Sequence, residues 1–509
     1  MKIRELNAKH EFYDADHWDT LESLAEGGKR FKKKLDKFLP MNPNEPGGRY
    51  ACRKKEAHYT SYMGSIVNLY VSWLFSAQFT CKANKRPDGQ PVDAPGASYA
   101  DFQADCGNET TLANFVKDRF RQAMKTSCAY WLAERASDGG DPPQTMLEYE
   151  QRGLNKVTLR ELHPCDLFDW ECDSDGKLIW AKVYTAYDER ANWATAGKLR
   201  TEIWRFYDSE NVTEYRVTYD KSKRPHADET VKASPPVSHG FKRVPVGKLC
   251  VPNELCVAEM TADPQLEHFR LSNGMSWAVR QTCYAMPILA TEDADTPARM
   301  GAGYFLQIGV DDKFSWSAPP TAPFDVLQKN IDAKRDEIYR IVHQMAQGLD
   351  NNAETVGRSA ESKEIDAAAT RLLLNEYGTY VSRALEDTLE LISEAIGDTD
   401  YEWSVEGFSG YDTATVASLL ENAKAAKLLG IPSETFEREI ATKAALALVP
   451  ELSSRVKDAI RTEIKNFKFT VSEETVEEAK IGLMASKAEF NKAKASESLT
   501  PAKPPAPSK

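Results

Sequence analysis

Residues 323–345 read PFDVLQKNIDAKRDEIYRIVHQM, and their apolar side chains recur at intervals of three and four residues. Such spacing predicts an amphipathic helix with a single packing stripe, interrupted only by Lys334. At 1.5 Å per residue the helix would be roughly 34 Å long. That length suits a spoke or strut better than an element of a small domain. The apolar positions are Phe324, Leu327, Ile331, Ile338, Ile341 and Met345.

A second helix is predicted upstream, over 263–285. It opens with Asp-Pro, an N-cap carboxylate followed by proline at the first helical position, and a proline at 287 stops it. Between the two helices, GYFLQIGVDDKFSWSA at 303–318 favours a strand, a turn at Asp311-Asp312 and a second strand. The expected order is therefore helix, small β module, helix.

Downstream, QGLDNNAETVGRS at 347–359 has few large apolar residues and predicts a polar loop. An unusually long helical pattern follows over 362–396, with Gly397 as its C-cap. At 1.5 Å per residue it would measure about 52 Å, a length typical of helices that bridge domains. The remainder predicts a small helical end and a proline-rich tail, with helices at 412–429, 433–448, 451–465 and 472–494.

The N-terminal half predicts an α/β region. Two amphipathic helices are expected, over 54–75 and 111–136. Short segments rich in Val, Ile, Thr, Tyr and Trp predict strands between turn residues. These segments are AQFTC at 77–81, KVTLREL at 156–162, KLIWAKVYTAY at 177–187, LRTEIWRFY at 199–207, VTEYRVTY at 212–219 and, beyond the long helix, YEWSVEGFSG at 401–410.

The composition limits what the protein can bind. Its formal net charge is −12, whereas proteins that grip nucleic acid tightly are usually basic, so we expect any DNA contact to be loose or local. Nine widely spaced cysteines without a CxxC pair argue against a disulfide framework and favour a reducing compartment. The longest apolar run, 65–75, is shorter than the ~18 residues that span a bilayer, and no signal peptide is recognisable, so we expect a soluble protein.

Motifs for catalysis and cofactors are missing from the sequence. It contains no GxxxxGK[ST], HExxH, GxSxG or EF-hand pattern, and Gly301-Ala302-Gly303 is an isolated GxG. The eight histidines show no metal-ligand spacing. Adjacent acids such as Asp311-Asp312 are more often turn formers than acid-base partners. We therefore expect no enzyme activity, no metal and no cofactor.

The order of elements resembles the portal family of tailed bacteriophages, the head-to-tail connectors. Several phrases are similar to portal counterparts, and together the resemblance covers most of residues 50–450. These phrases are KEAHYTSYMGSIVNLYVSWLFS, DCGNETTLANFVKDRFRQAMKTSCAYWLAE, RELHPCDLFDWECDSDGKLIWAKV, SHGFKRVPV and FSGYDTATVASLLENAKAAKLLGIPSETF.

The resemblance implies an α+β, mainly helical portal fold that assembles as a ring, usually of twelve subunits. Its parts carry over onto consecutive segments of this chain. They are a wing at 1–262, stem helices at 263–285 and 323–345, a β clip at 286–322, a tunnel loop at 346–361, the long helix and wing return at 362–410, a crown at 411–468 and a C-terminal helix with a disordered tail at 469–509.

Two groups of site residues follow from this placement. The first would line the DNA channel, although ordinary solvated helix charge explains its stem residues slightly better than DNA contact does: Asn351, Asn352, Arg358, Lys363, Lys334 and Arg340. The second would form a clip surface for docking proteins, although Trp316 could instead be buried between subunits: Asp311, Asp312, Phe314 and Trp316.

The implied function is a conduit at one capsid vertex for DNA packaging and ejection. Its implied partners are copies of the chain, the terminase large subunit, major capsid and scaffolding proteins, head-completion or tail adaptor proteins, and double-stranded DNA bound without sequence specificity, but no membrane. The implied location is the virion, after assembly in the host cytoplasm. Two alternatives remain open: another oligomeric virion protein, such as a neck or tail connector, or an uncharacterised enzyme.

Overall fold

The computed structural model divides the chain into two units, Met1–Tyr411 and Asp412–Lys509. Helices and sheets are mixed in the first unit, which confirms the expected α+β class. The described residues are 1–135 except 44, 77–78, 86–89 and 92–95; 145, 148 and 152; 156–282 except 190–196 and 198; 286–290; 313–317; 321–347; 360–408 except 399; 423–424; 433–448; and 454–467.

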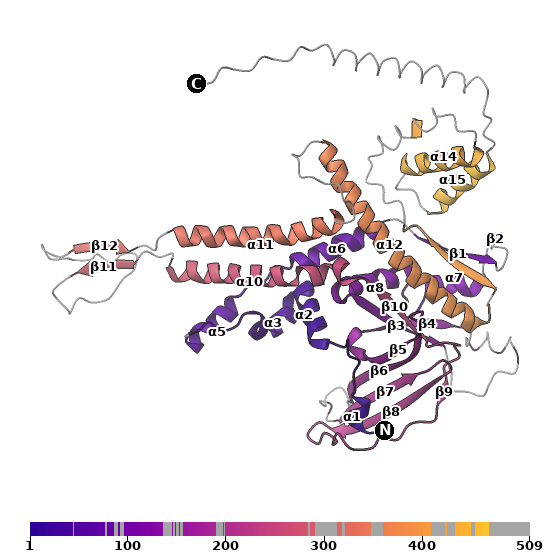
Figure 1. Ribbon diagram of the computed structural model, residues 1–509, viewed down its shortest axis with the longest axis horizontal. Helices are drawn as coiled ribbons and strands as arrows, with labels where there is room; N and C mark the ends of the chain where they lie inside the picture. Colours follow the sequence, from indigo (N-terminus) through magenta and orange to yellow (C-terminus); the bar gives the residue numbers. More distant parts are fainter. Residues whose placement is uncertain are drawn as a thin grey trace, which may run out of the picture. The chain divides into compact units, whose positions relative to one another are not determined.

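A five-stranded antiparallel sheet lies beside the N-terminus of the chain (Figure 1). Trp204 is fully buried on one face, beside Ile3 and Leu6 of the N-terminal helix α1 (Ile3–Leu6). Val183 and Tyr207 are buried on the opposite face. Both faces are thus covered, and the strands predicted at 177–187, 199–207 and 212–219 are confirmed. In sheet order the strands are β5 (Leu167–Cys172), β6 (Leu178–Glu189), β7 (Leu199–Tyr207), β8 (Asn211–Asp220) and β9 (Val237–Ser238).

A second sheet has the order β10-β3-β4 and corrects one sequence prediction. The helix predicted over 111–136 ends as α8 (Leu112–Thr126), after which Ser127 adopts a left-handed φ of 62°. The following residues form β3 (Cys128–Arg135), because β10 (Val246–Cys250) and β4 (Val157–Leu162) hydrogen-bond to it from both sides. Tertiary pairing here overrides a helical pattern.

The helix predicted over 54–75 is likewise two helices, α5 (Gly47–Glu56) and α6 (Tyr62–Leu74). Ser61 begins the second one, since its hydroxyl accepts a hydrogen bond from the N–H of Gly64 at 2.9 Å. The predicted strand at 77–81 is displaced toward the C-terminus and appears as β1 (Thr80–Lys85).

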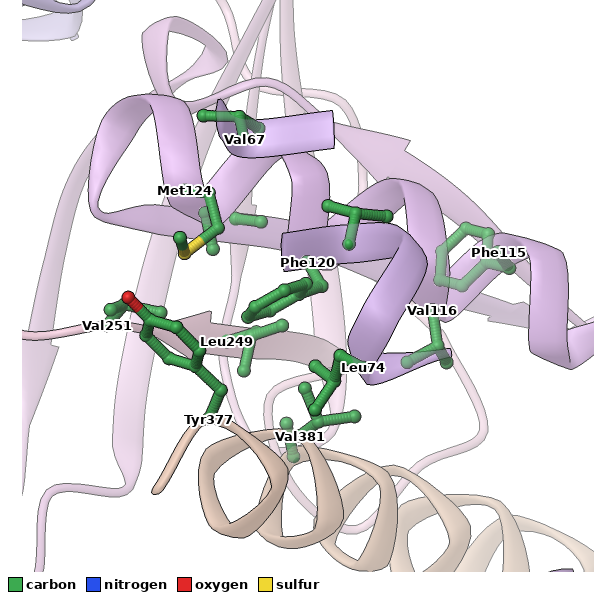
Figure 2. Packing of buried hydrophobic residues seen from close by; sticks show 14 of the residues in the cluster. Val67, Leu74, Phe115, Val116, Phe120, Met124, Leu249, Val251, Tyr377 and Val381 are labelled. Atoms are coloured by element: carbon green, nitrogen blue, oxygen red, sulfur yellow. The ribbon is translucent and has the colours of Figure 1, made fainter. Parts of the chain in front are cut away.

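Helices from distant parts of the sequence share one large hydrophobic core. In Figure 2, Phe120 of α8 lies between Leu74 of α6 and Tyr377 of α12 (Ala360–Ile396). Leu249 of β10 lines the same core. At 37 residues and 1.5 Å each, α12 is about 55 Å long, and it confirms the long helix predicted over 362–396.

The chain returns to the N-terminal region after α12. Strand β13 (Tyr401–Glu406) pairs antiparallel with β1, which in turn pairs with β2 (Gln90–Pro91). Gly378 of α12 allows a close approach at this point, since a Cβ there would overlap the carbonyl oxygen of Phe408. The strand predicted at 401–410 is therefore confirmed and closes the core of the first unit.

Two helices of equal length, α10 (Val257–Thr282) and α11 (Ala322–Gln347), precede α12. The predicted span of α11 is confirmed, but the predicted start of α10 at Asp263-Pro264 is wrong. The helix begins at Val257 and contains Pro264, because buried residues from Cys256 to Ala258 draw its first turn into the core.

The β module between these helices also differs from its prediction. Strand β12 (Lys313–Ser317) pairs with β11 (Met286–Ala290), directly after α10, rather than with a neighbouring segment. The predicted first strand and its turn at Asp311-Asp312 lie outside the described residues.

The second unit contains α14 (Glu434–Leu448) and α15 (Ser454–Asn466), which pack together and match the helices predicted at 433–448 and 451–465. The helices predicted at 412–429 and 472–494 fall almost entirely outside the described residues. Of the helices that are described, none combines the length and the apolar character required to cross a bilayer.

Candidate functional site

The feature that best suggests a function is the helical pair α10 and α11. Figure 1 shows them side by side and antiparallel, with the β11–β12 ladder beyond the ends where α10 finishes and α11 begins. Each has 26 residues and is about 39 Å long. Phe269 of α10 and Ile338 of α11 are buried in the main core, so one part of the pair is fixed within the first unit.

Two buried amide side chains fix α10 to the N-terminal helices. The Oε1 of Gln265 accepts hydrogen bonds from the N–H groups of Tyr62 (2.9 Å) and Met63 (3.2 Å), at the start of α6. Its Nε2 donates to the carbonyl of Thr60 at 3.0 Å. Gln265 therefore satisfies backbone groups that the beginning of a helix leaves unpaired.

Asn273 does the same one turn before α6. Its Oδ1 accepts from the N–H of His58 at 3.1 Å, and its Nδ2 donates to the carbonyls of His58 (3.2 Å) and Phe269 (2.7 Å). Nothing in the local sequence marks either amide as a functional group. Both hydrogen-bond to the backbone around the junction of α5 and α6, and the sequence pattern predicts a single helix there. These contacts hold the inner part of α10 rigid.

Charge on α11 is balanced rather than basic, since it carries four acidic and four basic side chains. Lys334 lies between two carboxylates, with its Nζ 2.9 Å from Glu267 of α10 and 3.0 Å from Glu337 of α11. Hydrogen bonds to these two groups raise the pKa of Lys334. Arg335 pairs in the same way with Asp332 at 3.2 Å. A helix with this pattern presents little net charge to a phosphate backbone.

His268 lies at the contact between the two helices and α6. Its ring meets that of Tyr62 edge-on, with centroids 5.1 Å apart. Burial, followed by the positive charge of Arg335, lowers the pKa of His268. At neutral pH this ring is therefore uncharged and acts as a packing group.

Several large apolar side chains remain exposed on the long helices and on α6. Val326 of α11 is the most exposed of them, at 59%. The others are Leu69 and Trp73 of α6, Met260 of α10, Tyr339 of α11 and Leu372 of α12. Side chains of this kind add apolar contact area wherever a partner covers the helices.

The residues predicted to line a channel are only partly described. Lys334 is engaged in the pair with Glu267, which favours the simpler interpretation of its charge, and Arg340 is exposed on α11. Lys363 falls in the first turn of α12. Asn351, Asn352 and Arg358 lie outside the described residues.

Among the predicted docking residues, Phe314 and Trp316 belong to β12 and stand opposite Leu289 and Pro287 of β11. Asp311 and Asp312 lie outside the described residues. Throughout the described part of the chain, no three His, Cys, Asp or Glu side chains are grouped so that they could hold a metal ion.

Comparisons with known proteins give the following. No protein-family model matches the chain, and no curated protein does. Among solved structures, the chain is similar to one from the neck of an empty gene transfer agent (GTA) particle computed with C6 symmetry. The identity is 12% and the TM-score 0.38, over 83% of this chain and 96% of that one.

It is also similar to a chain from the virion of a native gene transfer agent particle. There the identity is 12% and the TM-score 0.39, over 88% of this chain and 99% of the other. At TM-scores below 0.5 neither likeness establishes a shared fold, and at this identity neither assigns a role to any residue.

Proposed function

We propose that this chain is a structural subunit of an oligomeric virion assembly and that, within this class, it is a portal subunit of a tailed bacteriophage or phage-like particle. The observation that supports it best is the antiparallel pair α10 and α11, which carries a β ladder at one end and is fixed to a folded unit at the other. The 37-residue helix α12 follows this pair directly in the sequence.

In such an assembly the long helices would stand beside their copies and enclose a channel, with each subunit using one surface to contact the next and a different surface to receive the previous one. The exposed Val326 and Tyr339 of α11 provide apolar contact area for this packing. The balanced charge of α11 suits a wall along which DNA slides, since a strongly basic lining would retain phosphates.

The β11–β12 ladder would then project from the ring and provide the docking surface for the terminase motor and, after packaging, for head-completion or tail proteins. Double-stranded DNA would pass without sequence specificity. The proposal includes no catalytic residue and no cofactor in this chain.

Negative-stain imaging of the purified protein tests the proposal. A portal gives rings with a central hole wide enough for duplex DNA and a projecting stem. Rings or tubes without a stem would favour a neck or tail connector instead. Monomers at all concentrations would contradict both assignments.

A matched pair of variants tests which surface closes the ring. Val326→Glu places a charge at the proposed contact and should abolish rings while the subunit stays folded. Ile179→Glu changes a residue of β6 with comparable exposure, 49%, and should leave the rings intact. Assays of nucleotide hydrolysis and nuclease activity on the same material should be negative, and turnover in either would support the enzyme alternative.

A further inference from the structure

Two cysteines on neighbouring strands lie close enough to react with one another. Cys128, the first residue of β3, stands directly opposite Cys250, the last residue of β10. Their Sγ atoms are 2.7 Å apart, although 122 positions separate them in the sequence. Cys128 is half-buried and Cys250 is exposed, so reagents in solution can reach the pair.

The register of the ladder favours a bond between them. The N–H of Val251 donates to the carbonyl of Ser127 at 2.7 Å, and the N–H of Ala133 donates to that of Pro245 at 2.8 Å. Hydrogen-bonded pairs alternate with non-hydrogen-bonded pairs along an antiparallel ladder, so Cys128 and Cys250 form a non-hydrogen-bonded pair. In such pairs the Cα atoms are about 4.5 Å apart, within the range of disulfide-linked residues.

The surroundings make the two thiols unequal. The hydrogen bond from Cys250 lowers the pKa of Cys128 despite burial, and the hydroxyl of Tyr130 and the charge of Lys248 act in the same direction. The same contact raises the pKa of Cys250. Cys128 is therefore the better nucleophile of the two.

We propose that Cys128 and Cys250 form a redox-responsive disulfide, which closes when the protein meets an oxidising small-molecule disulfide and opens again on reduction. The thiolate of Cys128 attacks one sulfur of oxidised glutathione, forming a mixed disulfide and releasing one glutathione. The sulfur of Cys250 then attacks Sγ of Cys128 and releases the second. The glutathione disulfide takes up both electrons, and the two thiol protons are transferred to the two glutathione thiolates.

The bond would join the turn between α8 and β3 to the segment that leads from β10 into α10. In the reduced protein only strand pairing joins Cys128 to Cys250, and oxidation would add a covalent bond at this position. The inference uses only the pairing of β3 with β10, so it stands or falls separately from the portal assignment.

The test treats the full-length protein with oxidised glutathione and counts thiols in denaturant. The nine cysteines of the reduced chain should fall by two, and dithiothreitol should restore them. Tryptic mapping without reduction should join TSCAYWLAER to the peptide LCVPNELCVAEMTADPQLEHFR. That second peptide carries both Cys250 and the buried Cys256, so variants must distinguish them.

Cys128→Ser and Cys250→Ser should each abolish the linked peptide, whereas the exposed-site control Cys52→Ser should retain it. Lys248→Gln removes the tryptic site before Leu249, so its Cys250 peptide begins at Val244, and that longer linked peptide should form several-fold more slowly. The oxidised wild-type protein should unfold at a higher temperature than the reduced one, and the Cys250→Ser variant should show no such rise. A stable glutathione adduct on Cys128, or a link from either cysteine to the nearby Cys172, would overturn the proposal.

Discussion

Lys334 of α11 and Glu267 of α10 form an ion pair between the two antiparallel helices, with Nζ and Oε2 2.9 Å apart. The pair lies where the sequence places a channel-lining cation. This geometry indicates that Lys334 holds the two helices together rather than presenting a free charge to DNA.

Reversing the charge of Lys334 should weaken the contact between α10 and α11, and reversing the charge of Glu267 as well should restore it. Lys334→Glu brings a third acid beside Glu267 and Glu337, so at low ionic strength the thermal midpoint should fall. Adding Glu267→Lys should restore it. Because the charges are partly exposed, both effects should shrink at about 0.5 M salt. Equal losses in the single and double variants, measured by circular dichroism, would show that the two residues are not coupled.

Glu22 of α2 (Ala15–Glu26) predicts a dependence of stability on acid. Its side chain is buried and accepts hydrogen bonds from Nε2 of His163 at 2.8 Å and Nε2 of Gln122 at 2.5 Å, beside an ion pair with Arg30. Burial alone would raise the pKa of Glu22, but these bonds and the charges of His163 and Arg30 lower it to about 2.

A lowered pKa means that the folded state prefers the charged carboxylate, so this stabilisation is present above about pH 4.5 and is lost as the pH falls toward 2. Glu22→Gln should reduce the free energy of unfolding by roughly 3 kcal/mol at neutral pH and much less at pH 3. Denaturant titration at both values measures this. Glu11→Gln, at an exposed position shortly before α2, is the control. A loss for Glu22→Gln that is equal at both pH values would contradict the linkage.

Tyr377 predicts how firmly α12 is anchored. Its hydroxyl donates to the carbonyl of Leu255 at 2.7 Å, just before α10 begins, and its ring is fully buried. Tyr377→Phe leaves that carbonyl without its donor and should reduce stability by about 1–2 kcal/mol. Thr379→Ala, at an exposed position two residues further along α12, should change it much less. Chemical denaturation of both variants decides, and equal effects would argue against the anchor.

Two helical glycines predict opposite responses to the same substitution. Gly378→Ala places a methyl group against the backbone of Phe408 and should cost roughly 1–3 kcal/mol, because neither main chain can yield easily. Gly274→Ala in α10 meets open space and should stabilise the protein by about 0.5–1 kcal/mol. Thermal unfolding compares them. A stabilised Gly378→Ala variant would show that α12 does not approach that segment closely.

Elements with a strong periodic pattern could be predicted from the sequence, and elements defined by distant partners could not. The stripe at 323–345 and the alternating strand at 199–207 carry their signal within themselves. Strand β3 does not, because it becomes a strand through pairing with β10 and β4. Strand β12 could not be paired from local sequence either, because its partner β11 ends at Ala290, more than twenty residues before β12 begins at Lys313.

Candidate site residues show the same division. Lys334 was visible as the interruption of an apolar stripe, but its partner Glu267 lies on another helix and has no local mark. The amides of Gln265 and Asn273 hydrogen-bond to the backbone around the junction of α5 and α6. The sequence pattern predicts one continuous helix there, so it gives no sign of the junction. The reactive contact of Cys128 with Cys250 depends on β3 being a strand, so a helical prediction hides it.

The pairing of β13 with β1 has a consequence for synthesis of the protein. Thr80 leaves the ribosome more than three hundred residues before its partner Glu406, so β1 emerges long before the strand that completes its sheet. During that interval α12 has not yet been synthesised, so the apolar faces of α6 and α8 that pack against it stay exposed. Exposed faces of this kind favour aggregation, which chaperones prevent by binding them. Prematurely terminated chains would keep those faces exposed. Quality-control proteases can recognise such chains and degrade them before they aggregate.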